Sequence, residues 1–319
     1  RVWWAVVMHT KSVSSESVAI ESGMGLGSKY FNAHTNFSTW HDMGVEVSGP
    51  IVGDVNDHFV ELFNRARVNN AGGPASRNVR APSLRYEDYR YEGPSAPGHP
   101  AWVVTTDPEK HDYNYRGVFL AAVAAARKNI YLENAFFTDP LLMRMLLHKA
   151  REFRGRVNCA GLGEFECAKK KRAAVRIHIV LPDVTDQPLL DMVSRASLYE
   201  LLHLGVKIYR WNPQRGWSAK KMLHTKAWLV DYQEGEPALT YVGSANTTQR
   251  SHLADNELGI LSASPAFARE VYERLFYPDM TLGARLESTQ SFPVAESPRR
   301  LVRAGRQLRH LFVNVFWFF

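Results

Sequence analysis

The 319-residue chain has few cysteines and no long apolar run. Its two cysteines, Cys159 and Cys167, are eight positions apart, so they either close a small disulfide loop or stay as free thiols. No second cysteine pair lies nearby and no histidines show metal-ligand spacing, so a metal site is not expected. No run of 18 or more apolar residues occurs, and the sequence therefore predicts no membrane span.

The first residues, RVWWAVVMH, also lack the apolar region and cleavage site of a signal peptide. They are typical of a buried strand, and no initiator methionine precedes them. We therefore expect a processed product or a fragment. Either an N-terminal segment is missing, or a complementary chain supplies the absent elements.

Basic residues exceed acidic ones by 39 to 32, which gives a formal net charge of +7. An excess of this sign favours anionic partners such as phospholipid headgroups or nucleic acid, and it does not choose between them.

Glycine and proline cluster at both ends of residues 70–100, which predicts a linker between two units, 1–69 and 101–285. In the second unit apolar helices alternate with β-branched strands, a pattern that favours a parallel or mixed sheet with helices on its faces. The tail, 286–319, combines arginines with an apolar end. It is predicted to be a basic amphipathic helix that lies on an anionic membrane, packs on the domain, or belongs to a truncated element.

The most informative stretch is HTKAWLVD, in which His224 and Lys226 are two positions apart on a predicted strand. Residues at this spacing leave the same face of a strand, so an imidazole and an ammonium can act on one phosphate. Asp231 ends the strand. The segment GSAN then supplies Gly243, where the backbone can approach a ligand, and two short polar donors, Ser244 and Asn246. Glu257 follows in DNELG as a carboxylate able to orient a histidine.

This combination resembles the second catalytic half of the phospholipase D superfamily, and IYLENAFF resembles the strand that precedes it in phospholipase-type members. The resemblance implies two pseudo-symmetric α/β/α lobes with central mixed sheets, an α/β fold in which the first lobe is N-terminally incomplete here.

The first half-site is expected in MHTKSVSSE, where His9 and Lys11 repeat the spacing and Glu16 stands in place of the usual Asp. GLGSKYFN then offers Ser28 and Asn32, and WHDMGVEV offers Asp42. Asp42 lies 33 positions after His9, and Glu257 lies 33 positions after His224, which indicates a duplicated unit.

The resemblance implies phosphodiester cleavage through a covalent phosphohistidine, without metal or other cofactor. The family's usual order makes His9 the nucleophile and His224 the acid and base, and pseudo-symmetry also allows the reverse. Glu257 is expected to orient His9, and Asp42 to orient His224. The residues expected to bind phosphate oxygens are Lys11, Lys226, Ser28, Asn32, Ser244 and Asn246, and those with a structural role in the motif are Glu16, Asp231 and Gly243.

The leading hypothesis is a phospholipase D that hydrolyses a glycerophospholipid such as phosphatidylcholine to phosphatidate and free headgroup. The alternatives are a phosphatidyltransferase of the cardiolipin or phosphatidylserine synthase type, a nuclease of the same family, and a pseudoenzyme. We expect peripheral association with a phospholipid membrane and no nucleic acid as primary substrate. The sequence leaves open the headgroup and whether the compartment is cytoplasmic or extracellular.

Overall fold

A computed structural model of the chain describes residues 7–27, 30, 40–70, 83–91, 93, 98–157, 161, 163–164, 166–167, 175–212 and 222–288. Ser28, Asn32, Cys159, part of the predicted linker and the tail beyond residue 288 lie outside the described residues. Cys167 is disulfide-bonded. None of the helices within these ranges is both long and apolar enough to cross a membrane.

Eight strands form one large sheet in the order β11-β7-β6-β5-β8-β9-β10-β4. The central strands β5, β6 and β7 are parallel to one another, and the remaining neighbours are antiparallel. The prediction of an α/β fold with a mixed sheet is therefore confirmed for the second unit. The strands are β4 (Ala101–Thr106), β5 (Asn129–Asn134), β6 (Arg176–Pro182), β7 (Lys207–Trp211), β8 (Lys226–Val230), β9 (Leu239–Gly243), β10 (Glu257–Ser262) and β11 (Ala284–Leu286).

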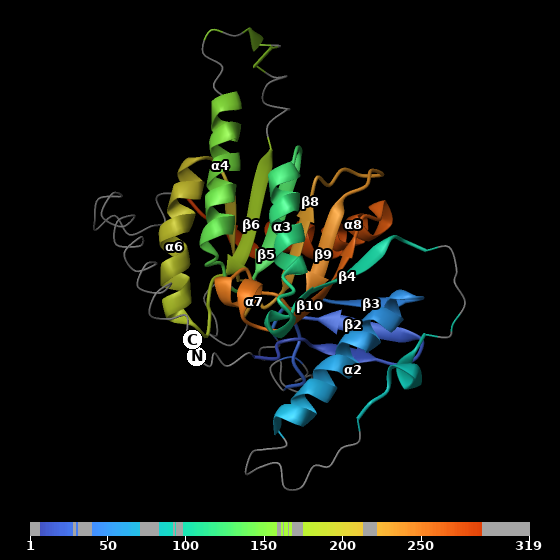
Figure 1. Cartoon of the computed structure of the whole chain (residues 1–319). Helices are drawn as coiled ribbons and strands as arrows, with labels where there is room; N and C mark the ends of the chain where they lie inside the picture. The colour runs from blue at the N-terminus through green and yellow to red at the C-terminus, as the bar shows by residue number, and fades with distance from the viewer. Residues whose placement is uncertain are drawn as a thin grey trace.

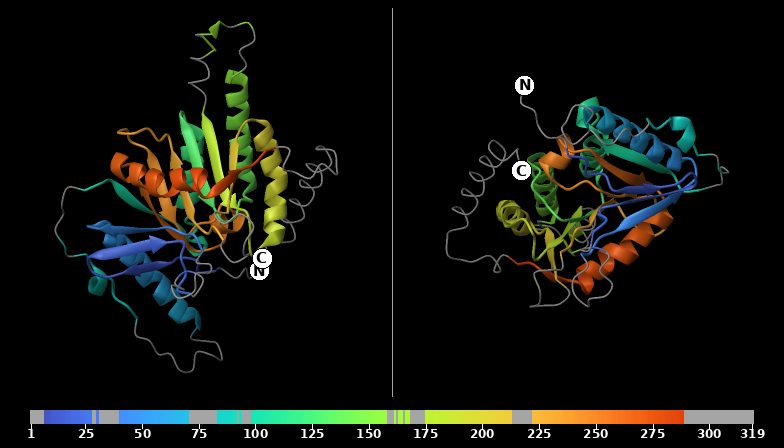
Figure 2. Two further views of the ribbon diagram at one scale, coloured as in Figure 1. Left: turned by 180° about the vertical axis from the view of Figure 1, so that it is seen from behind. Right: turned by 90° about the horizontal axis from the view of Figure 1, so that it is seen from below.

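Helices cover both faces of this sheet. Figure 1 shows α3 (Asn114–Ala125), α4 (Pro140–Val157) and α6 (Pro188–His203) on one face. Figure 2 shows α8 (Pro265–Val271) on the opposite face, where a π-helical turn (Tyr272–Phe276) and α9 (Tyr277–Thr281) continue it. Because both faces are covered, every residue of β8 and β10 is buried. Short helices α7 (Gln249–Leu253) and η3 (Pro108–Lys110) complete the unit.

The first unit contributes a three-stranded sheet of β1 (Ser12–Ser14), β2 (Val18–Ser22) and β3 (Gly44–Ser48). The resemblance implies a mixed sheet here, but within the described residues all strand pairs of this sheet are antiparallel. Helix α2 (Ile51–Asn70) packs on it, and Val52 and Val55 of that helix join a buried cluster that also contains Ala227 and Leu229 of the large sheet. The two sheets thus share one apolar core.

Two described parts of the predicted linker are tied to α2. The 3₁₀ helix η2 (Tyr86–Tyr89) contacts α2, since Asn56 Nδ2 donates to the Tyr89 carbonyl at 2.9 Å. Asn64 and Leu84 exchange two hydrogen bonds of 2.9 Å. At the other end of the second unit, β11 pairs with β7, and Glu287 is buried against Arg210. Ordered structure therefore extends past the predicted boundary at residue 285.

Candidate active site

Two histidine–carboxylate pairs lie where the first unit meets the large sheet. His9 Nδ1 lies 2.9 Å from Glu257 Oε2, and His224 Nδ1 lies 2.8 Å from Asp42 Oδ2. Each histidine therefore contacts a carboxylate from the other half of the sequence. With Nδ1–H donating to the carboxylate, Nε2 of each imidazole is the atom left for chemistry.

Backbone pairing between the two units sets this geometry. Met8, just before His9, forms a parallel bridge with Asn256, just before Glu257. His41, just before Asp42, forms a parallel bridge with Leu223, just before His224. The two half-sites are thus joined by the same kind of contact, each between the residue before a histidine and the residue before its carboxylate.

The two lysines of the motif lie near the histidine–carboxylate pairs, Lys226 fully buried and Lys11 half-buried. Lys226 Nζ lies 2.7 Å from Nδ1 and 3.0 Å from Nε2 of His224, and it also contacts the His224 carbonyl. Lys11 Nζ contacts the His9 carbonyl. Burial lowers the pKa of Lys226 to about 7 and also lowers the pKa of Lys11. Burial, followed by the charge of Lys226, lowers the pKa of His224 to about 4.

Ser244 and Asn246 lie on the turn after β9, and both are buried. The Ser244 hydroxyl donates to Glu257 Oε2 at 2.6 Å, so in this structure it holds the carboxylate that orients His9. Asn246 Oδ1 has no hydrogen-bond partner. Asn134, from the IYLENAFF segment, fixes this turn, because its side chain accepts from Thr247 N at 3.0 Å.

The three residues with predicted structural roles have different surroundings. Asp231 adopts φ 61° and accepts from the backbone N–H groups of Arg127 and Lys128 at 2.8 and 2.6 Å, which joins the ends of β8 and β5. A Cβ on Gly243 would lie 2.5 Å from Gly259 Cα, so this glycine allows close strand packing, whereas the sequence suggested an approach to a ligand. Glu16 is exposed between β1 and β2.

Several residues at the site were missed from the sequence. Tyr30 OH lies 2.9 Å from His224 Nδ1, and the Trp40 ring centroid lies 5.0 Å from that of His224. Glu21 is buried near Lys11, and burial raises its pKa well above the usual range. Tyr30 lies within GLGSKYFN and Trp40 begins WHD, so the available signal was an aromatic residue in each of these two segments.

One group in the described part of the chain has the composition to hold a metal ion: His41, Glu133 and Asp279, whose ligand atoms lie within 4.8 Å of one another. The His41 imidazole is half-buried, and its Nε2 lies 2.7 Å from Asp279 Oδ2. The contact between His41 and Asp279 is that of an ordinary hydrogen bond.

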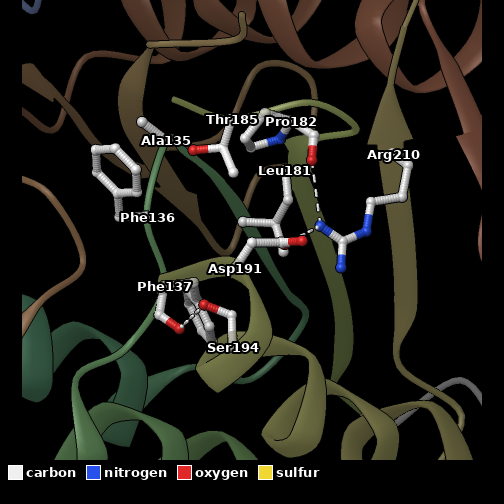
Figure 3. A pocket seen from close by; sticks show the side chains of 9 residues that line it. All are labelled: Ala135, Phe136, Phe137, Leu181, Pro182, Thr185, Asp191, Ser194 and Arg210. Atoms are coloured by element: carbon white, nitrogen blue, oxygen red, sulfur yellow. Dashed lines mark hydrogen bonds and ion pairs between the residues drawn. The ribbon is translucent and has the colours of Figure 1, made fainter. Parts of the chain in front are cut away.

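Two cavities lie away from the reacting atoms. Figure 3 shows one beside buried Arg210, whose guanidinium binds Asp191 at 3.0 Å and the Pro182 carbonyl at 3.1 Å. Its volume of ≈ 10 Å³ suits about one water molecule. Since Asp191 and Glu287 already pair with Arg210, this cavity offers no free charge to an anion. A larger cavity of ≈ 850 Å³ lies between β3 and α8, lined in part by Tyr91 and Phe267.

The chain is similar to several known proteins. A family model described as "Cardiolipin synthase, PLD-like domain" matches residues 166–277. The chain is 21% identical over 271 residues to a cardiolipin synthase of Clostridium perfringens (strain SM101 / Type A), covering 84% of this chain and 48% of that protein. It is 23% identical over 305 residues to cardiolipin synthase A of Pseudomonas fluorescens (strain SBW25), covering 95% of this chain and 53% of that protein.

The chain therefore spans about half the length of these curated relatives. Among solved structures, phosphatidylserine synthase of Haemophilus influenzae Rd KW20 aligns over 97% of this chain and 70% of its own, with a TM-score of 0.60 and 13% identity. That likeness concerns the fold. The family model and the sequence relatives show that this chain carries a phospholipase D-like domain, the domain of the phospholipase D superfamily.

Proposed function

We propose that the chain cleaves a phospholipid phosphodiester and transfers the phosphatidyl group to an alcohol, through a covalent phosphohistidine. The observation that carries this proposal is the pair of histidine–carboxylate contacts made across the two halves, His9 with Glu257 and His224 with Asp42. The relatives named above are a pair of cardiolipin synthases and a phosphatidylserine synthase, which favours transfer over the hydrolysis that leads the expectations from sequence. Hydrolysis is the second candidate, with water as acceptor.

In the first step, Nε2 of His9 attacks phosphorus, the N–P bond forms and the bond to the leaving alcohol oxygen breaks. His224 donates a proton to that oxygen. In the second step, the hydroxyl oxygen of the acceptor attacks phosphorus and gives its proton to His224. The N–P bond then breaks, and both histidines return to their starting states.

The two carboxylates would orient the imidazoles and stabilise each imidazolium as it forms, as the Asp does in a catalytic triad. The two lysines would neutralise the charge that grows on the phosphate oxygens. Because Lys226 already lies beside His224 Nε2, an incoming phosphodiester oxygen would take the place of that ring nitrogen as the partner of the ammonium.

The low pKa of His224 bears on the order of the two histidines. A general acid must carry a proton, so His224 must take one up together with the anionic substrate in the order proposed above. The reverse order, in which His224 attacks, needs an unprotonated His224 and no such uptake. The two orders therefore differ in which histidine carries the acid proton and in which one becomes phosphorylated.

We also infer that the small sheet is the counterpart of β8, β9 and β10. In both sets three antiparallel strands follow one another in sheet order. In both, the histidine comes just before the first strand, and the carboxylate lies at or just before the start of the third. This correspondence supports two pseudo-symmetric lobes, and we propose that the substrate is held between them at a membrane surface.

The test uses vesicles of phosphatidylglycerol, with products separated by mass spectrometry. Transfer predicts cardiolipin, and added ethanol should divert the product to phosphatidylethanol. If phosphatidate is the only product, with and without ethanol, the reaction is hydrolysis and the proposal of transfer is wrong. Degradation of DNA, strongly dependent on salt and without lipid turnover, would instead support the nuclease alternative.

Variants assign any activity to the site. His9→Ala and His224→Ala should each abolish turnover, whereas His148→Ala, at an exposed position on α4, should leave it unchanged. Equal turnover in all three variants would contradict the proposal.

A further inference from the structure

The side chain of His41 is fixed by two groups of the second unit. Its Nε2 donates to Asp279 Oδ2 at 2.7 Å, and its ring stacks on Trp211 with a centroid distance of 4.7 Å. Trp211 Nε1 in turn donates to Asp279 Oδ1 at 2.9 Å. Asp279 thus accepts one hydrogen bond on each oxygen and joins the ends of β7 and α9 to the segment that carries Asp42. We call these three residues the His41 cluster.

The backbone of His41 is bonded to the strand that carries His224. His41 N donates to the Met222 carbonyl at 2.9 Å, and His224 N donates to the His41 carbonyl at 2.7 Å. The peptide that follows His41 leads directly to Asp42, whose Oδ2 contacts His224 Nδ1. A rotation of this segment would therefore move the carboxylate and its histidine out of register.

We propose that His41 is a positioning residue, held by Asp279 and Trp211, that keeps the Asp42 carboxylate against His224. The inference rests on the proposed function for its kinetic consequence only. It assigns His41 no contact with substrate and no proton transfer.

The other half-site has a different support. Asn256 occupies the position before Glu257, and its side-chain Nδ2 is buried without a partner. Glu257 is instead held directly by the Ser244 hydroxyl at 2.6 Å. Asp42 accepts from Met43 N, which follows it in the same segment. The register of that segment therefore decides where Asp42 lies, and the His41 cluster anchors it.

Glu133 lies beside the cluster, fully buried, with Oε1 at 3.9 Å from His41 Nε2. Within the part of the chain that the structure describes, neither of its oxygens has a hydrogen-bond partner. Burial, followed by the charge of Asp279, raises the pKa of Glu133 well above its usual range, so protonation is one way to offset its charge. A divalent cation bound by Glu133, Asp279 and His41 would be the other way to offset it.

The kinetic test compares His41→Ala with His41→Gln, whose amide N–H can donate to Asp279 from a similar position. His41→Ala should lower kcat roughly 10- to 100-fold with KM changed less than about threefold, because a displaced carboxylate misplaces a catalytic group without touching substrate contacts. His41→Gln should recover most of that loss.

A matched control is the other buried His–Asp pair, His252 Nδ1 with Asp139 Oδ2 at 2.9 Å, where both side chains are fully buried. His252→Ala should lower the unfolding temperature and leave kcat per folded molecule unchanged. An equal loss of kcat in His41→Ala and His252→Ala would reduce His41 to a stabilising role and overturn the proposal.

A second readout needs no turnover, so its failure is distinguishable from failure of the proposed function. ¹⁵N NMR of the substrate-free enzyme should show a slowly exchanging Nδ1–H on His224 in the wild type and in His252→Ala. Fast exchange is expected in His41→Ala. Asp279→Asn leaves one oxygen acceptor for the two donors His41 Nε2 and Trp211 Nε1, so the His224 Nδ1–H should exchange fast in this variant as well. It replaces His41→Ala in the test if that variant does not fold. An unchanged His224 signal in both cluster variants would refute the inference.

Titration with MnCl₂ and with ZnCl₂ separates the cation alternative. Binding that disappears in Glu133→Gln would establish a metal site and overturn the positioning account. Absence of binding, with Glu133→Gln folded and active, is the result expected when Glu133 carries a proton.

Discussion

Gly23 lies directly against the Asp42 carboxylate, and its replacement tests how closely that carboxylate must be placed. A Cβ on residue 23 would lie 2.5 Å from Asp42 Oδ1 and 2.8 Å from Oδ2. Ordinary contacts begin at 3.4 Å, so Gly23→Ala should push the carboxylate away by about 0.9 Å. We expect a displacement of that size to disturb the 2.8 Å hydrogen bond between His224 Nδ1 and Asp42 Oδ2.

The expected cost falls on catalysis more than on folding. The clashing atoms are the end of a side chain, and Gly23 has an ordinary φ, so alanine is compatible with the backbone there. A misplacement of about 1 Å costs roughly 10²-fold in rate. We therefore expect kcat to fall about 100-fold while the unfolding temperature changes little.

The assay is lipid turnover at saturating substrate, together with thermal unfolding of the same preparations. Gly117→Ala is the matched control, because Gly117 lies on the exposed face of α3 with nothing within 4 Å of an added Cβ. That variant should keep full activity and gain up to about 1 kcal/mol of stability from its higher helix propensity. Full activity in Gly23→Ala would refute the claim that Asp42 must sit against His224.

Three further predictions concern charge, orientation and stability. Because the pKa of Lys226 is about 7, its ammonium loses the positive charge as the pH rises through 7, and kcat/KM should fall over the same range. Lys226→Met should be slow at every pH. A wild-type pH profile that stays flat from 6 to 9 would contradict this. Ser244→Ala removes the hydroxyl that holds Glu257 and should lower kcat roughly 10-fold with KM nearly unchanged. An unaltered kcat would show that His9 does not need Ser244 to hold its carboxylate. Asp231→Ala removes the acceptor of the Arg127 and Lys128 backbone N–H groups at a position with positive φ. Chemical denaturation should show a free energy of unfolding lower by about 2–3 kcal/mol with kcat unchanged, and a smaller loss in Asp231→Asn. A free energy of unfolding equal to that of the wild type in Asp231→Ala would exclude this role.

The parts of the fold that the sequence predicts are those with a strong local pattern. The Ala-rich run of α3 and the Pro starts of α6 and α8 are read from neighbours in the chain. Strand β10, ELGILS, was missed because all its residues are buried and no polar alternation marks it. Strand β4 pairs with it from about 150 positions earlier, at the edge of the sheet, and was missed as well.

The contacts of the site divide in the same way. The resemblance names the two histidines and the two carboxylates, and the equal spacings of 33 residues assign each to its half. The hydrogen bond of Ser244 to Glu257 and the packing of Gly243 on Gly259 depend on how β9 lies against β10, which no local pattern reveals. The bond between His41 and Asp279 joins residues 238 positions apart and was invisible for the same reason.

The most direct measurement of the central claim is to trap the intermediate. The enzyme would be mixed briefly with phospholipid labelled at phosphorus, quenched in alkaline detergent, which preserves phosphohistidine, and mapped by peptide mass spectrometry. The account predicts a phosphorylated His9, absent in His9→Ala. Label on His224 would reverse the order of the two histidines. Steady turnover with no label on either histidine would contradict the covalent mechanism itself.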